Sequence, residues 1–298
     1  MHLSNLDLKV CDFTSRLPGP LAGSILSDLG ARVVKLELEN ALDPFNPKNA
    51  NSPEEMFGAW YKNLNASKEQ LVIKSLESSE VKNVLEESDI ALIPGNKKYS
   101  VLKELFPETL FIEVCGGSGN QKYLHDLNAL FLTKSFKLHL EATNGDTLPY
   151  LPFAGVVFAQ QIALEALGAY VESTSGKKEN RKIYLDQAAS RVLDKLWTNS
   201  LEDSETPKAL HTGKYPCYNI YQSSDGRYIG LAAVENKFWI KFCEIFNLTF
   251  SLEDRFDESG RTGQSISKMF LSYTGKEIEE LIGNSDICIN LFPKKEKE

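Results

Sequence analysis

The chain has 298 residues, of which 42% are hydrophobic and 25% charged, as is typical of a globular protein with one or two domains. Its 33 basic and 41 acidic residues leave a net charge of −8, which argues against a nucleic-acid partner. Five scattered cysteines without a C-x-x-C pair argue against a disulfide framework or a zinc site. We therefore expect a cytoplasmic protein without a metal, because a reducing compartment suits unpaired thiols.

Neither a leader nor a membrane span is expected from the sequence. Residues 1–10 lack the apolar core of a signal peptide. Residues 147–164 form an uncharged run that approaches the length of a membrane span. Two prolines and two glutamines interrupt this run, so a buried helix is the better interpretation and no membrane partner is expected.

The first part of the chain, residues 9–38, is predicted to form a strand, a helix and a second strand. The apolar residues around Val10 and Phe13 indicate a short buried strand, and a Pro-Gly-Pro turn opens a helix with leucines and isoleucine at helical spacing. Gly30 ends this helix, because glycine takes the left-handed C-terminal position without a Cβ penalty. Residues 33–36 then begin the second strand, so the unit should be parallel and right-handed.

Helices continue to alternate with apolar strands, which predicts a Rossmann-like, doubly wound and mostly parallel α/β sheet. The predicted helices cover 54–62, 79–87, 101–106, 125–135, 153–171 and 187–197, and the predicted strands cover 70–73, 89–93, 110–114 and 182–185.

A polar stretch, 201–214, is interpreted as a linker between a large α/β domain, 1–200, and a smaller α+β domain, 215–298. In the smaller domain, two apolar runs flank Ser-Asp-Gly, which is a strong hairpin signal. The elements expected there are strands 218–221 and 228–231 and helices 236–246, 266–273 and 276–282.

Residues 12–37 also fit a longer motif, D-x-[ST]-x-x-x-x-G-P-x-A-x-x-x-L-x-D-L-G-A-x-V-[IV]-K-[LIV]-E. From spacing alone the turn after the first strand could be purely structural, because it lacks both G-x-G-x-x-G and the Walker pattern. The motif, however, resembles the opening of the family III CoA-transferases, and the similarity extends from about residue 6 to 246. The matching positions are Asp12, Thr14, Gly19, Pro20, Ala22, Leu26, Asp28, Leu29, Gly30, Ala31, Val33, Val34, Lys35, Leu36 and Glu37.

This resemblance implies an enzyme that acts on acyl-CoA thioesters, because the family includes formyl-CoA and carnitine CoA-transferases and α-methylacyl-CoA racemase. The reaction would be CoA transfer between carboxylic acids or racemisation at the α-carbon of a 2-methylacyl-CoA. The CoA thioester would be the substrate, with no separate cofactor, and the protein a homodimer. Full-length relatives continue beyond the position of Leu291 with a segment that returns to the large domain. Their subunits are linked rings, and whether this chain interlocks stays open.

Two candidate catalytic residues follow from the resemblance. His125 lies in L-H-D-L-N-A-L, which is similar to the racemase segment whose histidine exchanges a proton beside the thioester. By itself it could equally be a surface residue at a helix start. Glu235 lies in a segment similar to the family stretch whose glutamate reaches the active site from the second domain. Its carboxylate could also simply interact favourably with the positive end of the dipole of the following helix.

Further candidates would contact the substrate. Asp126 could cap a helix or orient the ligand. Lys97 and Lys98 stand where relatives carry an arginine, and they retain the charge without bidentate geometry. The remaining candidates for CoA binding are Lys35 of the motif and the loop glycines Gly116 and Gly117.

The main departure from the family pattern is Pro152. By alignment it replaces the aspartate that serves transferases as nucleophile and racemases as the second proton-transfer group, and proline can do neither. Asp146 is a distant substitute, because a catalyst must lie within reach of the reacting atom. A second hypothesis is therefore a catalytically impaired relative that binds a CoA thioester or a partner protein.

Overall fold

The computed structural model describes residues 6–49, 57–143, 145, 147–149, 151–196 and 210–292. The chain divides into two compact units, 1–137 with 146–197, and 138–145 with 198–298. The linker expected over 201–214 lies mostly outside the described residues, which resume at Leu210. The short segment 138–145 groups with the second unit, which the sequence did not indicate.

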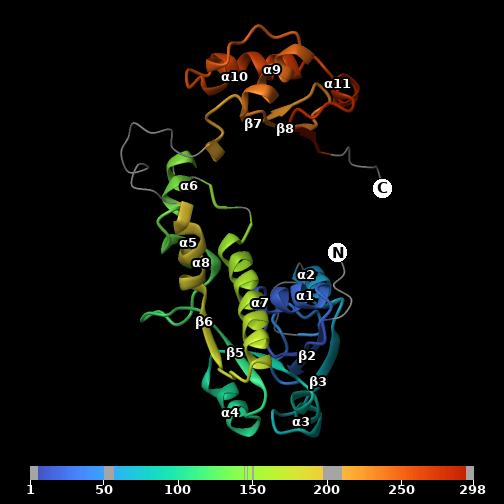
Figure 1. Cartoon of the computed structure of the whole chain (residues 1–298), viewed down its shortest axis with the longest axis vertical. Coiled ribbons are helices and arrows are strands. Elements are labelled where there is room, and N and C mark those ends of the chain that lie inside the picture. The colour runs from blue at the N-terminus through green and yellow to red at the C-terminus, as the bar shows by residue number, and fades with distance from the viewer. Residues whose placement is uncertain are drawn as a thin grey trace. The chain divides into compact units, whose positions relative to one another are not determined.

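The first unit contains a six-stranded sheet in the order β3-β2-β1-β4-β5-β6, with every pair parallel (Figure 1). This is the order of a doubly wound fold, so the predicted α/β class is confirmed. The order reverses between β1 and β4, where such sheets bind ligands beyond the carboxyl ends of the strands. The strands are β1 (Lys9–Asp12), β2 (Arg32–Leu38), β3 (Glu69–Ile73), β4 (Ile90–Pro94), β5 (Leu110–Cys115) and β6 (Arg181–Tyr184).

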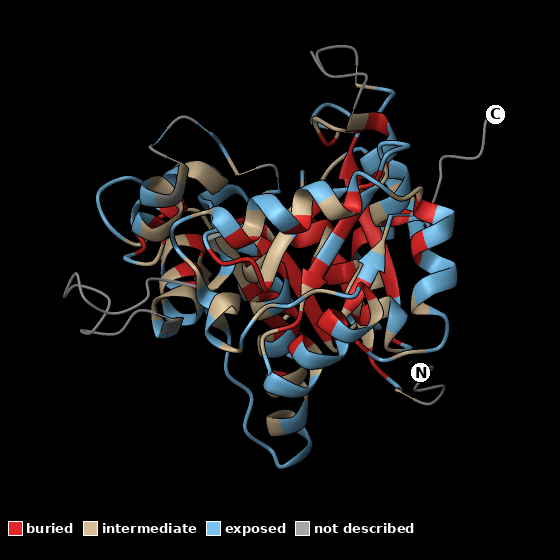
Figure 2. Ribbon diagram, turned by 90° about the horizontal axis from the view of Figure 1, so that it is seen from above, coloured by how far each residue is buried: buried red, intermediate tan, exposed pale blue. Residues whose placement is uncertain are grey.

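Helices cover both faces of this sheet, and buried residues gather in the strands between them (Figure 2). On one face, Val81 and Leu85 of α3 and Leu102 of α4 pack against strand residues such as Phe111. On the other face, α1 and α7 lie against each other, as Figure 1 shows. The helices of the first unit are α1 (Pro18–Asp28), α2 (Gly58–Asn65), α3 (Ser79–Glu86), α4 (Lys97–Leu105), α5 (Asp126–Phe131), α7 (Phe153–Thr174) and α8 (Leu185–Leu193). Helix α6 (Phe136–Thr143) begins in the first unit, but most of it belongs to the segment 138–145 that groups with the second.

Helix α7 is the one helix in the described residues that could cross a membrane by length and composition. Its buried residues include Ala154, Phe158, Ile162 and Ala166, each with at most 2% of its surface exposed. Small alanines on this face allow α1 to approach closely. This packing assigns the apolar face of α7 to the core of the first unit.

Several predicted boundaries differ from those observed. Helix α4 begins at Lys97 rather than Val101, because the Asn96 side chain accepts a hydrogen bond from the Lys98 N–H (3.1 Å) and caps the helix. Helix α8 begins at Leu185, directly after β6. Helix α2 begins at Gly58, and residues 54–56 of the helix predicted over 54–62 lie outside the described residues.

The second unit contains an antiparallel sheet, β7-β8-β9, and the hairpin predicted between its first two strands is confirmed. Its core is aromatic, with Trp239, Phe242 and Phe270 at most 1% exposed. Helix α6 and strand β9 were not predicted, because each is short and carries little periodic pattern. The elements are β7 (Tyr218–Gln222), β8 (Tyr228–Ala232), α9 (Asn236–Ile245), α10 (Arg261–Phe270), α11 (Gly275–Ile282) and β9 (Ile289–Leu291).

Candidate functional site

Two adjoining cavities open at the carboxyl ends of the strands of the first unit. The first, here the β1–β4 cavity, has a volume of about 340 Å³ and lies where the strand order reverses. The second, here the α7 cavity, has a volume of about 470 Å³ and lies at the amino end of α7. Ser15 lines both, so the two form neighbouring parts of one surface. The polar lining of the first includes Glu37, Asp43, Asn96 and Lys98, and that of the second Arg16, Lys122, His125 and Asp126.

The loop between the cavities is held by a buried carboxylate. Arg16 has a φ of 65°, a left-handed conformation that is uncommon outside glycine. Its backbone N–H donates to both carboxylate oxygens of Asp43, at 3.0 and 2.9 Å. The N–H of Asp43 in turn donates to Glu37 Oε2 at 2.8 Å. The strained backbone is therefore fixed, and the Arg16 side chain is left to line the α7 cavity.

Beneath the same loop lies a charged group that is closed to solvent. Lys68 Nζ lies 3.0 Å from Asp12 Oδ2, and both side chains are 0% exposed. Thr14 donates to Asp12 Oδ1 from its N–H (2.9 Å) and from its hydroxyl. Burial alone would raise the pKa of Asp12, but the ammonium groups of Lys35 and Lys68 and the Thr14 hydrogen bonds lower it to about 2. Asp12 is therefore ionised and ties β1 to the turn that opens α1.

Lys35 belongs to this buried group. It is 1% exposed, and its ammonium donates to the Thr14 carbonyl oxygen. Lys35 thus has no exposed surface from which to reach a phosphate, and we assign it to holding the turn. Lys98 is exposed and lines the β1–β4 cavity, whereas Lys97 is exposed but does not line either cavity.

The two loop glycines allow a close crossing of the backbone. A Cβ on Gly117 would lie 1.8 Å from the Gln121 carbonyl oxygen, and one on Gly116 2.6 Å from that of Lys122. Only glycine fits at these positions without moving the 121–124 segment, which carries Lys122 to the cavity. Gly116 also lines the α7 cavity.

The segment after this loop brings His125 and Asp126 together at the α7 cavity. The His125 N–H donates to the Asn128 side chain at 3.0 Å, and α5 begins at Asp126. Asp126 Oδ1 accepts a hydrogen bond from the Gly155 N–H in the first turn of α7, at 2.6 Å. Burial raises the pKa of Asp126, and hydrogen bonds from the Gly155 and Ala154 backbones oppose this rise.

The sequence did not single out the bond between Asp126 and the first turn of α7. Pro152 precedes α7 as its N-cap, where it provides no side-chain hydrogen bond. Asp126 supplies that bond from a distant part of the chain instead. The sequence also gave no signal for Arg16, which occupies an unspecified position of the motif, or for Lys122.

Glu235 lies in the second unit, where it is exposed and its carbonyl oxygen accepts the first hydrogen bonds of α9. His125 lies in the first unit, so their joint action stays a prediction. Asp146, the distant substitute for the missing aspartate, lies outside the described residues.

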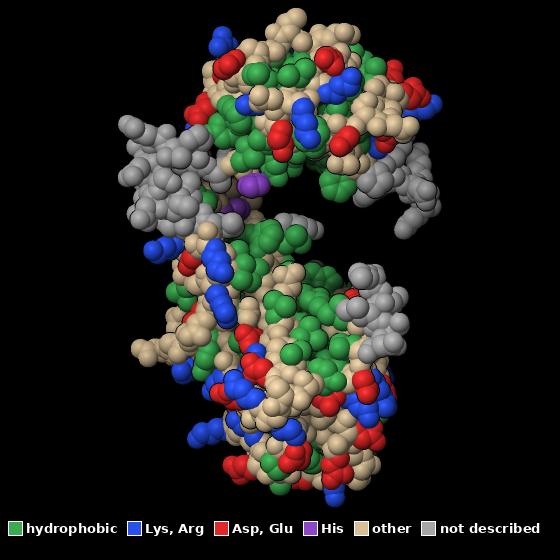
Figure 3. Space-filling view, in the orientation of Figure 1, with side chains coloured by type: hydrophobic (Ala, Val, Ile, Leu, Met, Phe, Trp, Pro, Cys, Tyr) green, Lys and Arg blue, Asp and Glu red, His purple; other side chains and the backbone are tan. Residues whose placement is uncertain are grey.

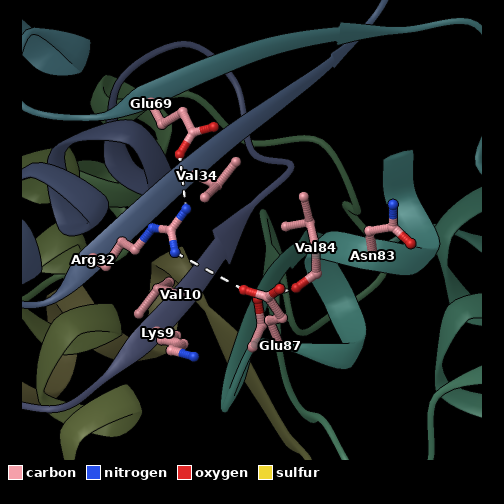
Figure 4. A pocket seen from close by; sticks show the side chains of 9 residues that line it. Lys9, Val10, Arg32, Val34, Glu69, Asn83, Val84 and Glu87 are labelled. Atoms are coloured by element: carbon pink, nitrogen blue, oxygen red, sulfur yellow. Dashed lines mark hydrogen bonds and ion pairs between the residues drawn. The ribbon is translucent and has the colours of Figure 1, made fainter. Parts of the chain in front are cut away.

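A smaller cavity of about 130 Å³ lies at the other end of the strands, beside the amino ends of β1 and β2 (Figure 4). Arg32 points into it, with its guanidinium 3.1 Å from Glu69 and 3.9 Å from Glu87. The carboxylates neutralise this cation. This cavity is therefore less suited to bind an anion than the β1–β4 cavity and the α7 cavity at the carboxyl ends of the strands.

The surface adds no strongly charged band on the face drawn in Figure 3, where Lys and Arg side chains are interspersed with Asp and Glu. Within the described residues, no group of three His, Cys, Asp or Glu side chains is placed to hold a metal ion.

The chain is similar in sequence and in fold to several known proteins. The sequence is 25% identical over 272 residues to an (R)-2-hydroxy-4-methylpentanoate CoA-transferase of Clostridioides difficile, covering 83% of this chain and 67% of that protein. It is 23% identical to a CaiB/baiF CoA-transferase family protein of Caenorhabditis elegans, covering 95% and 84% of the two chains. The fold matches the crystal structure of a CAIB/BAIF family protein from Brucella suis with a TM-score of 0.70 at 19% identity, over 97% of this chain and 84% of that one.

The sequence model of CoA-transferase family III matches residues 6–293, which is nearly the whole chain. This match confirms the resemblance that the motif around Asp12 and Gly19 indicated. The chain therefore belongs to CoA-transferase family III.

Proposed function

We propose that this protein transfers coenzyme A between carboxylic acids, with the acyl-CoA lying along the two adjoining cavities of the first unit. The observation that carries the proposal is the shared lining residue Ser15, which joins a cavity at the sheet's reversal point to one that holds a carboxylate. A long, narrow substrate with a charged nucleotide end and a reactive thioester end suits such a two-part surface. The relative from Clostridioides difficile is itself named a CoA-transferase.

At least one cation lines each cavity, as binding of the anionic CoA requires. Lys98 lines the β1–β4 cavity and Arg16 and Lys122 line the α7 cavity. Among the described residues, neither the Arg16 guanidinium nor the Lys122 ammonium forms an ion pair with a carboxylate, so these cations can bind phosphates or a carboxylate. His125 and Asp126 then lie at the thioester end.

The test is a direct assay of exchange. The purified protein is incubated with a panel of acyl-CoA donors and free carboxylic acids, and new acyl-CoA species are measured by mass spectrometry. Arg16→Gln and Lys98→Gln should each raise KM by roughly 10- to 100-fold, because each removes a charged hydrogen bond of about 1.5–3 kcal/mol. Lys82→Gln is the matched control, because Lys82 is 64% exposed on α3 and pairs only with Glu86 at 3.7 Å. Absence of exchange across the panel would refute transfer.

A second reaction is favoured by the placement of His125 beside Asp126, since an imidazole and a carboxylate in one cavity can exchange a proton at the α-carbon. Uptake of deuterium from D₂O at that carbon measures this reaction separately. A third outcome follows from Pro152. If CoA stabilises the protein in a thermal-shift titration, by about 2.7 kcal/mol at 100-fold its Kd, yet neither reaction occurs, the chain is an impaired relative that only binds the thioester.

A further inference from the structure

The amino end of α7 carries no reactive side chain of its own. Pro152 precedes the helix, and its first turn consists of Phe153, Ala154 and Gly155. None of these residues can attack a thioester or hold a transferable proton. A transferase that forms a covalent intermediate needs a nucleophilic side chain within reach of the thioester, and a carboxylate is one of the groups that can serve.

Asp126 places a carboxylate at this point from another element. Its Oδ1 lies 2.6 Å from the Gly155 nitrogen, and the side chain lines the α7 cavity beside His125. The positive end of a 22-residue helix favours the ionised form of such a group.

We propose that Asp126 is the reacting carboxylate of this chain and replaces the one that is missing at position 152. The proposal rests on the CoA transfer proposed above and names the residue that carries it. A purely structural role, in which Asp126 only caps α7, is the alternative that the experiment must exclude.

The reaction would proceed in four steps. A carboxylate oxygen of Asp126 attacks the thioester carbon of the donor, the C–S bond breaks, and CoA leaves as the thiolate, which gives a mixed anhydride. The thiolate attacks the aspartyl carbonyl, which releases the donor acid and leaves an aspartyl-CoA thioester. The acceptor carboxylate attacks this thioester and releases the CoA thiolate, which then attacks the acceptor's acyl carbon. The products are the new acyl-CoA and the original carboxylate, with no oxidant or proton consumed.

The structure suggests how the surroundings assist. Burial makes the Asp126 carboxylate more basic than an exposed one, and therefore a stronger nucleophile. The Gly155 N–H fixes Oδ1 and so orients the group. The exposed Arg16 guanidinium in the same cavity can bind the acceptor acid, which must itself be a carboxylate.

The experiment combines trapping with a conservative variant. The protein is incubated with the acyl-CoA that it exchanges and then with hydroxylamine, which converts an aspartyl thioester to a hydroxamate that peptide mapping locates. Asp126→Asn keeps an oxygen to accept from Gly155, so the helix cap and the melting temperature should be retained. Exchange should fall by roughly 10³-fold or more, because the nucleophile is lost. Glu86→Gln is the matched carboxylate control, because Glu86 is 55% exposed on α3 and lines neither cavity.

A hydroxamate at Asp126, absent from Asp126→Asn, supports the proposal. A hydroxamate at another residue, or exchange that survives in Asp126→Asn, overturns it while CoA transfer stands. Absence of both exchange and hydroxamate in the unmodified protein overturns the proposed function, and this inference with it. A melting temperature of Asp126→Asn far below that of the unmodified protein, with the hydroxamate found elsewhere, assigns Asp126 to capping alone.

Discussion

Replacing Lys68 by methionine should destabilise the first unit strongly. Lys68 Nζ contacts Asp12 Oδ2 at 3.0 Å, the Pro20 carbonyl oxygen at 2.7 Å and Asn65 Oδ1 at 2.9 Å. Methionine fills a similar volume but leaves the carboxylate buried without this partner. Removal of one member of a buried ion pair costs about 3–5 kcal/mol, so we expect the free energy of unfolding to fall by that amount.

The pKa of Asp12 gives an independent check on the direction of this effect. Its ordinary value of 3.8 is lowered to about 2 by Lys35, Lys68 and the Thr14 hydrogen bonds, so the ionised carboxylate stabilises the folded state. This contribution is complete above pH 3.8 and is lost as the pH falls toward 2. The difference in stability between the unmodified protein and Lys68→Met should therefore narrow on acidification.

Urea unfolding followed by far-ultraviolet circular dichroism measures both effects. Lys82→Met serves as the control, because its pair with Glu86 is more than half exposed and should be worth less than about 0.5 kcal/mol. The double variant Asp12→Asn/Lys68→Met should regain part of the lost free energy of unfolding, because the unpaired charge of the Asp12 carboxylate is then removed. A Lys68→Met protein that unfolds at the same urea concentration as the control would refute the assignment of a stabilising buried pair.

Three further predictions concern the turn, the site and the second unit. Gly19→Ala should destabilise the protein by about 1–3 kcal/mol, because the new Cβ would lie 2.0 Å from the Thr14 hydroxyl oxygen; an unchanged thermal midpoint would contradict this. On acidification, kcat/KM should begin to fall at a pH above 3.8, because burial raises the pKa of Asp126 and only its ionised carboxylate attacks. A value of kcat/KM that stays constant down to pH 3.8 would exclude Asp126 as the nucleophile. Phe270→Ala should cost about 3–5 kcal/mol, because Phe270 is 0% exposed, whereas Ile220→Ala, at 71% exposed, should cost little. Near-ultraviolet circular dichroism of the aromatic core reports that loss.

The sheet of the first unit was predictable because each strand is a short apolar run bounded by turn residues. The order in which the strands pair, with its reversal between β1 and β4, was not predicted, because the periodicity of one strand does not specify its neighbours. Helix α6 and strand β9 were not predictable, because eight and three residues carry too little pattern to identify an element.

The candidate site was predicted in part. His125 and Asp126 were named from the sequence, and the structure brings both to one cavity. The bond between Asp126 and Gly155 joins residues 29 positions apart, so no local pattern could indicate it. Lys35 shows the opposite case, because a lysine in a motif looks like a ligand contact until its burial is known.

The charged side chains of the first unit are either buried or exposed, and the two groups should respond differently to ionic strength. Asp12 and Lys68 are sealed from water together, so mobile ions cannot come between them. Arg16 and Lys98 face solvent, where the screening length is about 10 Å in 0.1 M salt. Added salt should therefore weaken capture of an anionic ligand long before it loosens the loop that presents these cations.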